Sequence, residues 1–492
     1  MKISRILHAG YVFESGGTQI LFDPIFENPF SRNCHAFPDV RFDPDQIRQL
    51  TPDAIFISHF HDDHCSFDSL HLLPRATPVY LYCLFEELFA MLRELGFTNV
   101  NSLEIDQPVH VGAFEIIARR ALDDEVDSMF HIRAEGLNIL NVVDSWMDPH
   151  TLEQLKAYAP WDMVLWPFQT MREVDVIAPS RTRDGDTAPE LVCAPVPAMA
   201  GARATPAVAL PDDWPGQLQA LNPRYVVPSS CQFVQEPWSW YNHAMFPITY
   251  RQFAQDAGAW LPAAHVVRLD PSVAFELTPQ ALTPAAPLPW VIPVGDQDVD
   301  FQYDPAIKPP ATADIARRFP ALTVEQAALV LDFCQRGLLQ KYEEMELPDD
   351  SYFMEPRLWQ LTVFDHDGSG RRFRYRIHGD SIERADIEDG STPGDSLDAG
   401  GSAGTSIAGR SIEPGSIAAA TDSQPLGWTT EIPAAKLYAG LALGESLTSM
   451  YLRINGAPED ADIADDPLIR CLFNDAFGAY QAAQLKRLKE TA

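Results

Sequence analysis

The chain has 492 residues, too many for one ordinary hydrophobic core, so we expect at least two domains. Its formal net charge is −33 at pH 7, and no basic stretch of useful size offsets that excess, which argues against binding to nucleic acid or another polyanion. No apolar run reaches the roughly 20 residues that would span a bilayer, so we expect no membrane association.

The seven cysteines are scattered through the chain, and none forms a CxxC pair. This spacing predicts neither a zinc ribbon nor a redox dithiol. An odd number of widely spaced cysteines is typical of reduced thiols inside the cell. The first residues show no apolar segment of the kind that a signal peptide requires. We therefore expect a cytoplasmic protein.

The chain opens with a predicted β-hairpin. Apolar residues over 3–13 and 19–22 flank a turn at 15–17. His8 and Asp23 lie at the predicted strand ends, from which either could reach a site. We expect both to cap turns or to support a ligand, because residues in such places usually hold a ligand rather than act as one.

The chain is organised around Ser58-His59-Phe60-His61-Asp62-Asp63-His64, which follows the apolar segment Ala54-Ile55-Phe56-Ile57. The apolar segment is typical of a buried strand. His59 and His61 are two residues apart, so in an extended chain they point to the same side. Asp63 and His64 follow as the chain turns and can face a second point a few ångströms away. Because clustered buried polar groups are costly without a ligand, this stretch predicts a site for two metal ions.

The spacing His-x-His-x-Asp-His resembles the metal-binding motif of the metallo-β-lactamase superfamily. The resemblance covers about the first half of the chain and implies an αββα sandwich. Two further stretches are similar to the branch that includes the sialic-acid-nucleotide hydroxylase and, for the first stretch, ascorbate-lactone hydrolases. The diiron β-hydroxylases of antibiotic assembly lines resemble this branch on the same fold. The two stretches are the opening, from Leu7-His8-Ala9-Gly10-Tyr11 to Leu21-Phe22-Asp23-Pro24, and the segment Pro228-Ser229-Ser230 with Asn242-His243.

The resemblance also implies the remaining site residues. In the superfamily an Asp ends a buried strand and bridges the two metals. Asp144 matches that place after the predicted strand 137–143, although it could instead cap a helix that begins at 149. The final ligand implied is His243, which could also pack among the aromatic residues of its loop. Asp63 would be the catalytic residue that orients the nucleophile. The implied metal ligands are His59, His61, Asp63, His64, Glu125, Asp144 and His243.

One position of the usual pattern lacks its histidine. Hydrolases of the superfamily place a His some twenty residues before the bridging Asp, but here that window holds Asp123, Asp124, Glu125 and Asp127. We assign the third ligand to Glu125 on its spacing, although these acids could also form a solvated loop. A carboxylate in place of an imidazole makes a site harder, which favours Fe or Mn over Zn.

Prolines recur over 279–315, which predicts a linker between a metal-binding domain at 1–278 and a C-terminal α+β domain at 316–492. In the second domain we predict a helix capped by Thr323 and a β-hairpin over 358–377. Residues 387–425 are rich in Gly, Ser, Ala and Asp, and we expect them to be flexible. No chemistry is assigned to this domain, which we expect to act as a substrate lid or to form a homodimer. The fold class is α+β.

Two functions fit one site. In the first, two iron ions and O₂ hydroxylate a small-molecule substrate, and a separate protein donates electrons because no Rieske-type Cys-x-His pair is present. In the second, two zinc ions activate a water that attacks an ester, lactone, amide or phosphodiester. The missing histidine, the nearby carboxylates and the Pro-Ser-Ser…Asn-His segment favour the oxygenase. The intact four-ligand turn argues against a third alternative, a metal-free binding protein.

Overall fold

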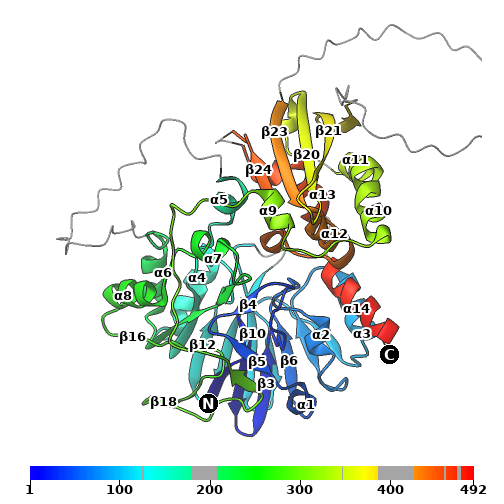
Figure 1. Cartoon of the computed structure of the whole chain (residues 1–492). Coiled ribbons are helices and arrows are strands. Elements are labelled where there is room, and N and C mark those ends of the chain that lie inside the picture. Colours follow the sequence, from blue (N-terminus) through cyan, green and yellow to red (C-terminus); the bar gives the residue numbers. More distant parts are fainter. Residues whose placement is uncertain are drawn as a thin grey trace, which may run out of the picture.

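The computed structural model describes residues 1–123, 127–179, 208–345, 347–385, 426–458, 461–473 and 478–491. Two mixed β-sheets build the N-terminal part, and a separate five-stranded sheet builds the C-terminal part (Figure 1). The predicted α+β class and the αββα sandwich are confirmed.

The first sheet of the sandwich has eight strands. In spatial order they are β18 (Leu282–Pro284), β17 (Ala274–Leu277), β1 (Lys2–Arg5), β2 (Tyr11–Ser15), β3 (Thr18–Phe22), β6 (Ala54–Ile57), β7 (Val79–Leu81) and β8 (Val100–Ser102). The antiparallel pair β2–β3 confirms the predicted opening hairpin. Strand β6 lies parallel between β3 and β7, and all four of its residues are buried. This explains its unbroken apolar sequence, because a strand covered on both faces needs no alternation.

The second sheet has seven strands. In spatial order they are β16 (His265–Val266), β14 (Tyr225–Ser229), β13 (Met163–Pro167), β12 (Leu137–Asn141), β11 (Ser128–Ala134), β10 (Phe114–Arg120) and β9 (Pro108–Val111). Strands β12, β13 and β14 are parallel, so their carboxyl ends lie at one edge of the sheet. The loops that follow β12 and β13 therefore open toward the same region as the loop after β6.

A shared apolar layer joins the two sheets. Phe22 and Phe56 of the first sheet pack with Phe130 of the second, at ring-centroid distances of 4.8 and 6.1 Å. Helices cover the outer faces (Figure 1). They are α1 (Pro44–Ile47), α2 (Phe67–Leu70), α3 (Glu86–Glu94), α4 (Pro149–Leu155), α5 (Glu173–Ile177), α6 (Trp214–Leu221), α7 (Tyr241–Ala244) and α8 (Tyr250–Trp260).

Two short strand pairs tie loops to the sandwich. Strand β4 (His35–Ala36) pairs with β15 (Phe233–Val234), and β5 (Val40–Phe42) pairs with β19 (Val291–Pro293). The proline-rich range 279–315 thus contains two strands, β18 and β19. Both are short and lie at sheet edges, where a proline without an N–H donor is tolerated.

The C-terminal sheet has the order β22 (Ser381–Arg384), β21 (Gly370–His378), β20 (Arg357–Phe364), β23 (Leu426–Pro433) and β24 (Arg453–Asn455). The antiparallel pair β20–β21 confirms the predicted hairpin. Its helices are α9 (Thr312–Ala316), α10 (Val324–Asp332), α11 (Leu338–Glu343), α12 (Ala434–Leu443), α13 (Pro467–Phe473) and α14 (Ala479–Thr491). Thr323 caps α10 in a reciprocal box with Gln326, as predicted. The stretch 387–425, predicted to be flexible, lies outside the described residues.

The last helix returns to the first domain. Helix α14 lies against α2 and α3, far from the sheet that precedes it in sequence (Figure 1). None of the helices in the described part of the chain is both long enough and apolar enough to cross a membrane.

Candidate metal centre

Side chains that can bind a metal gather at one edge of the sandwich. The turn 59–64 directly follows β6, and Asp144 follows β12 after two residues of connecting chain. Asp127 immediately precedes β11, and His8 lies in the turn between β1 and β2. Four separate elements therefore bring their donors to the same point.

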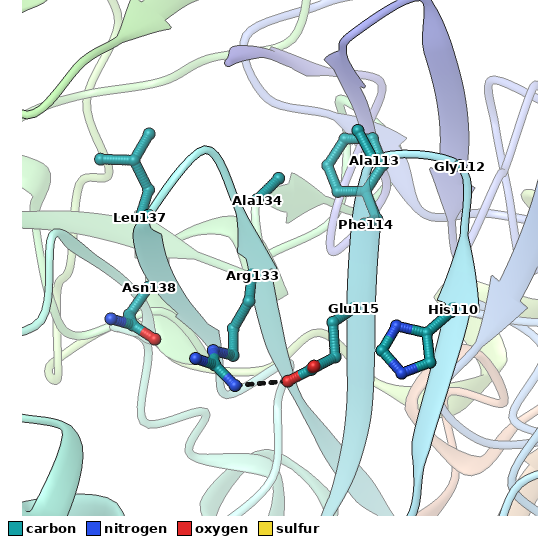
Figure 2. A pocket seen from close by; sticks show the side chains of 10 residues that line it. His110, Gly112, Ala113, Phe114, Glu115, Arg133, Ala134, Leu137 and Asn138 are labelled. Atoms are coloured by element: carbon teal, nitrogen blue, oxygen red, sulfur yellow. Dashed lines mark hydrogen bonds and ion pairs between the residues drawn. The ribbon is translucent and has the colours of Figure 1, made fainter.

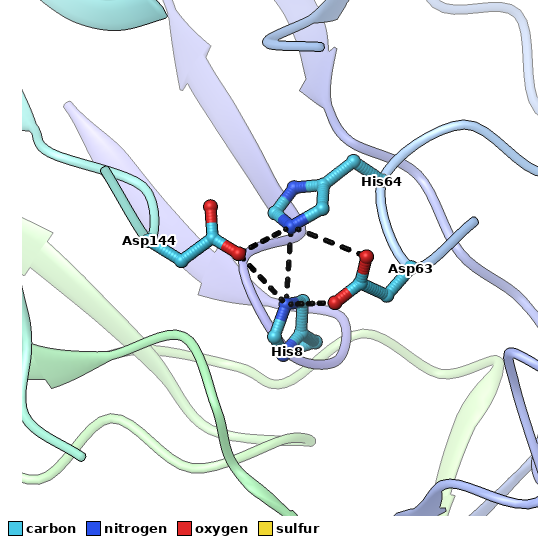
Figure 3. A group of neighbouring side chains, drawn as sticks. All are labelled: His8, Asp63, His64 and Asp144. Carbon is cyan, nitrogen blue, oxygen red and sulfur yellow. Dashed lines mark hydrogen bonds and ion pairs between the residues drawn. The ribbon is translucent and has the colours of Figure 1, made fainter. Parts of the chain in front are cut away.

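The first group consists of His8, Asp63, His64 and Asp144, whose ligand atoms all lie within 4.8 Å of one another (Figure 3). His64 Nε2 is 3.0 Å from Asp144 Oδ2 and 3.7 Å from Asp63 Oδ1. His8 Nε2 is 3.0 Å from Asp63 Oδ2 and 3.2 Å from His64 Nε2. Two ligands that share one ion at about 2.1 Å are separated by about 3 to 3.5 Å, so this spacing suits a metal ion.

The second group consists of His59, His61 and Asp127. His59 Nε2 is 3.0 Å from His61 Nδ1 and 3.6 Å from Asp127 Oδ1. Asp144 lies between the two groups, because its Oδ1 is 3.9 Å from His59 Nε2 while its Oδ2 contacts His64. One carboxylate is thus placed to bridge two ions.

The buried residues behind the centre fix the orientation of two histidines. Asp23 accepts hydrogen bonds from the Ser58 amide (2.8 Å), the Ser58 hydroxyl (2.7 Å) and His64 Nδ1 (3.0 Å). The Ser58 hydroxyl donates its only proton to Asp23. Its oxygen therefore accepts a hydrogen bond from His59 Nδ1 at 2.9 Å. Each ring therefore donates from Nδ1 and directs its Nε2 atom at the centre, where a bound metal would replace any proton on it.

Asp23→Asn should disturb this arrangement. The asparagine Oδ1 would still accept from the Ser58 N–H, so its Nδ2 amino group would face His64 Nδ1. Two donors would then meet, which would force the His64 proton from Nδ1 to Nε2. We expect metal affinity to fall about 10- to 100-fold, measured by competition with a chromogenic chelator. The control is Asp53→Asn, which changes an exposed carboxylate that accepts a hydrogen bond from the main-chain N–H of Gln19. Equal affinities in the two variants would contradict this role of Asp23.

His8 is held by the main chain around it. Its φ is +50°, and its carbonyl accepts from the buried Arg5 guanidinium, which also donates to Pro228 O at 3.1 Å. The His8 ring lies 5.6 Å from Phe30 and 6.2 Å from Phe233. A fully buried imidazole in an aromatic pocket, with Nε2 facing carboxylates, fits a ligand better than a turn cap.

The electrostatics favour the metal-binding state of most donors. Burial and then the charge of His64 lower the pKa of His59 to about 4, so this ring is neutral at pH 7. Burial opposes ionisation of Asp144, but His64 and His59 outweigh it and hold the carboxyl pKa well below its usual range. Burial opposes a charge on His64, yet Asp144 and Asp63 raise its pKa well above its usual value. Burial and then Asp144 raise the pKa of Asp127 to about 7.

These residues fit metal ions. Asp127 Oδ1 and Asp144 Oδ1 are buried and have no hydrogen-bond partner, although both face the histidines. A buried carboxylate oxygen without a partner is costly, and a bound cation would remove that cost. The donor set of four imidazoles and three carboxylates suits Zn, Fe or Mn.

Metal affinity should fall as the pH drops below 7. Asp127 and His64 must each lose a proton to bind a metal. Because the pKa of each is raised, both groups keep their protons as the solution becomes more acidic. We expect the apparent Kd for Zn²⁺ to rise about tenfold or more per pH unit below pH 7, measured by chelator competition from pH 5.5 to 8. Asp127→Asn should flatten this slope. An affinity that stays constant from pH 5.5 to 7 would contradict the assignment.

The ligands assigned from the sequence can be compared with the structure as far as it describes them. It places His59, His61, Asp63, His64 and Asp144 together, but His243 lies in neither group. After β14 the chain first forms β15, which pairs with β4, and then enters α7, where His243 Nδ1 contacts the Gln302 carbonyl at 3.0 Å. His8 joins Asp63, His64 and Asp144 in the first group.

The other assignment, Glu125, belongs to the acidic window before β11. Glu125 lies outside the described residues, whereas Asp127 joins His59 and His61. Sequence spacing alone does not show which acidic residue of this window is the metal ligand. The useful signal is that Asp127 adjoins a strand, β11, whose neighbours β10 and β12 also end at the centre.

A hollow of about 310 Å³ lies elsewhere on the second sheet (Figure 2). It is flanked by the turns at Gly112 and Gly136 and crossed by an ion pair between Arg133 and Glu115. These turns join β9 to β10 and β11 to β12, so they lie at the ends of the strands opposite to Asp127 and Asp144. The hollow is therefore separate from the metal centre.

Residues 2–230 match the family model described as the beta-lactamase superfamily domain. The predicted resemblance is thereby confirmed. The cytidine monophosphate-N-acetylneuraminic acid hydroxylase of Danio rerio is 28% identical over 155 residues, which is 29% of this chain and 26% of the relative. The Mus musculus protein of the same name is 29% identical over 156 residues, 29% of this chain and 26% of the relative. The match spans about a quarter of the length of these relatives.

Solved structures of two kinds are similar to the chain. Igni18, a metallo hydrolase from Ignicoccus hospitalis, is 18% identical and has a TM-score of 0.37, covering 56% of this chain and 99% of that chain. CmlA, a diiron β-hydroxylase from Streptomyces venezuelae, is 18% identical and has a TM-score of 0.31, covering 47% of this chain and 44% of that chain.

Proposed function

We propose that this chain is a dinuclear metal-dependent oxygenase that hydroxylates a small molecule, with iron as the preferred metal. The observation that supports it best is Asp127. It stands with His59 and His61 where the hydrolases of the superfamily are expected to have a third histidine. Together with Asp63 and Asp144 it gives a donor set with three carboxylates, which is harder than an all-histidine site and favours iron over zinc.

The reaction balances as R–H + O₂ + 2e⁻ + 2H⁺ → R–OH + H₂O. Bound iron would supply the activation of O₂. Asp144 would hold the two ions together, and the Asp23–Ser58 pair would keep the Nε2 atoms of His59 and His64 directed at them. The two electrons would come from a separate donor protein, because the sequence has no Rieske-type Cys-x-His pair of its own.

The curated relatives support the same reaction class, since they are named as hydroxylases. They match only 29% of this chain, so the substrate of this chain is a separate question. A hydrolase is the second candidate. Four histidines suit zinc well, and burial of Asp63 is outweighed by His64 and His8, which keep its pKa below its usual range, so an ionised carboxylate could orient a water.

The two candidates differ in what they consume. Apo protein would be loaded anaerobically with Fe²⁺ in one sample and Zn²⁺ in another. For the oxygenase we expect the iron sample to take up O₂ when mixed with it and a chemical reductant, and the zinc sample to hydrolyse 4-nitrophenyl acetate no faster than the Asp144→Ala variant. Ester hydrolysis by the zinc sample, with no O₂ uptake by the iron sample, would favour the hydrolase.

A further inference from the structure

The C-terminal helix reaches the metal-binding turn. Gln481 of α14 is 2% exposed, and its Nε2 donates to the carbonyls of Phe60 and Cys65, both at 2.7 Å. A side-chain amide has two N–H groups, so it can make both bonds at once. The two carbonyls lie at either end of the segment that carries His61, Asp63 and His64. One side chain therefore spans the turn from outside.

A second glutamine fixes the chain just after the turn. Gln484 is 5% exposed, and its Oε1 accepts from the Phe67 amide at 2.6 Å. Its Nε2 donates to Ser66 Oγ at 2.9 Å, and Ser66 is the N-cap of α2. The two glutamines lie three residues apart, so they project from the same face of α14.

Within itself the turn has few main-chain bonds. His64 N and Cys65 N both donate to the His61 carbonyl, at 3.1 and 2.8 Å. These bonds close the loop, but they do not attach it to the rest of the molecule. The bonds from Gln481 do so, and they come from a residue more than 400 positions later in the chain.

We propose that Gln481 is a positioning residue of the metal centre and that α14 is thereby part of that centre. The inference rests on the metal site of the proposed function, but on neither reaction in particular. It gives the C-terminal third of the chain a role: by docking α14 it holds His61, Asp63 and His64 at the spacing that two ions require.

The test is metal affinity in the full-length protein. Gln481→Met keeps the side-chain length and removes both donors. We expect its Kd for Zn²⁺ to rise about 10- to 100-fold in chelator competition, and the visible spectrum of its Co²⁺ form to change. The matched control is Arg487→Ala, on the same helix, which removes only the ion pair with Asp68 and should stay within about threefold of wild type.

Hydrogen exchange provides a second readout that does not need metal. In the apo protein, Gln481→Met should speed amide exchange over 60–66, whereas Arg487→Ala should leave it unchanged. If Gln481→Met does not fold, Gln481→Glu, which keeps the polar carbonyl oxygen, takes its place. Wild-type affinity and exchange in the glutamine variant would overturn the proposal. Failure of wild-type protein to bind two metals would instead contradict the metal centre itself.

A separate observation concerns the mouth of the centre. Four large apolar side chains are exposed beside it: Leu84 (60%), Phe85 (39%), Leu122 (60%) and Trp146 (47%). We call them the apolar rim. Phe85 packs edge-on against Phe60 at 5.9 Å, and Phe60 packs against His61 at 5.1 Å. The Leu122 main-chain amide donates to the Trp146 carbonyl at 2.8 Å, and Trp146 lies two residues after Asp144 in the sequence.

Basic residues are absent from the described stretches beside the rim. Residues 82–86, 121–123 and 144–148 contain no Lys or Arg, and apart from the candidate ligand Asp144 they carry three carboxylates, Glu86, Asp123 and Asp148. Arg120, the nearest basic residue in sequence, lies beside Asp148. An apolar group could cover the exposed Trp and Leu side chains.

We infer that the rim binds an uncharged aromatic or branched-alkyl group of the substrate. This rests on the proposed function. Two hydroxamates probe it, because both bind a metal through the same group but differ in their apolar part. We expect benzohydroxamate to bind the Co²⁺-loaded protein about tenfold more tightly than acetohydroxamate, and Trp146→Ala to reduce that ratio to about two.

The control is Leu329→Ala, which removes an exposed apolar side chain on α10. It should leave the ratio of the two hydroxamates unchanged. A ratio that is the same in wild type, Trp146→Ala and Phe85→Ala would overturn the inference. If neither hydroxamate binds the loaded wild-type protein, the metal centre is contradicted, and this inference falls with it.

Discussion

Replacement of Asp144 by alanine is expected to remove both metal ions. Its two oxygens lie 3.0 Å from His64 Nε2 and 3.9 Å from His59 Nε2, so no other residue of the described centre contacts both groups in the same way. Its loss also leaves the buried His64 without the first of the carboxylates that favour its charge. We expect metal content to fall from two ions per chain to well below one, and activity to fall about 10²-fold or more.

Elemental analysis after gel filtration measures this loss. The matched control is Asp123→Ala, because Asp123 contributes its carbonyl, not its carboxylate, to the Asp127 amide. The control should keep both ions. Two bound metals in Asp144→Ala would contradict the bridging role, and equal losses in both variants would point to unfolding of the loop instead.

Replacement of Asp127 by histidine is expected to change which metal is bound. The substitution restores an imidazole beside His59 and His61, which softens the site. We expect the zinc-to-iron ratio in purified protein to rise at least about tenfold and O₂ uptake to be lost.

Asp127→Ala separates a change of metal from simple loss of a ligand. It should lower the affinity for both metals without favouring zinc. The account would be contradicted if Asp127→His retained iron and O₂ uptake at wild-type levels.

The centre could be predicted from sequence where its residues are contiguous or end a strand. The turn 59–64 is one segment, and Asp144 directly follows an apolar stretch, so both places were readable from local pattern. His8 and Asp127 depend on how β1, β10 and β11 meet, which no local pattern specifies. His243 is implied by the resemblance to the hydroxylase branch, but strand β15, which pairs with β4, lies between the end of β14 and α7, the helix that carries His243.

The contribution of α14 to the metal centre could not be predicted from the sequence. Its glutamines look like ordinary polar residues of a C-terminal helix, and only the tertiary structure shows that Gln481 and Gln484 are buried against the metal-binding turn. Buried polar groups of this kind are recognised by their partners, not by their residue type.

The central claim is that the carboxylate-rich pair of sites holds iron. The most direct measurement is the metal content and Mössbauer spectrum of wild-type protein purified aerobically without added metal. We expect close to two irons per chain, with the spectrum of a magnetically coupled ferric pair. Two zinc ions per chain with negligible iron, or a single ion of either metal, would contradict it.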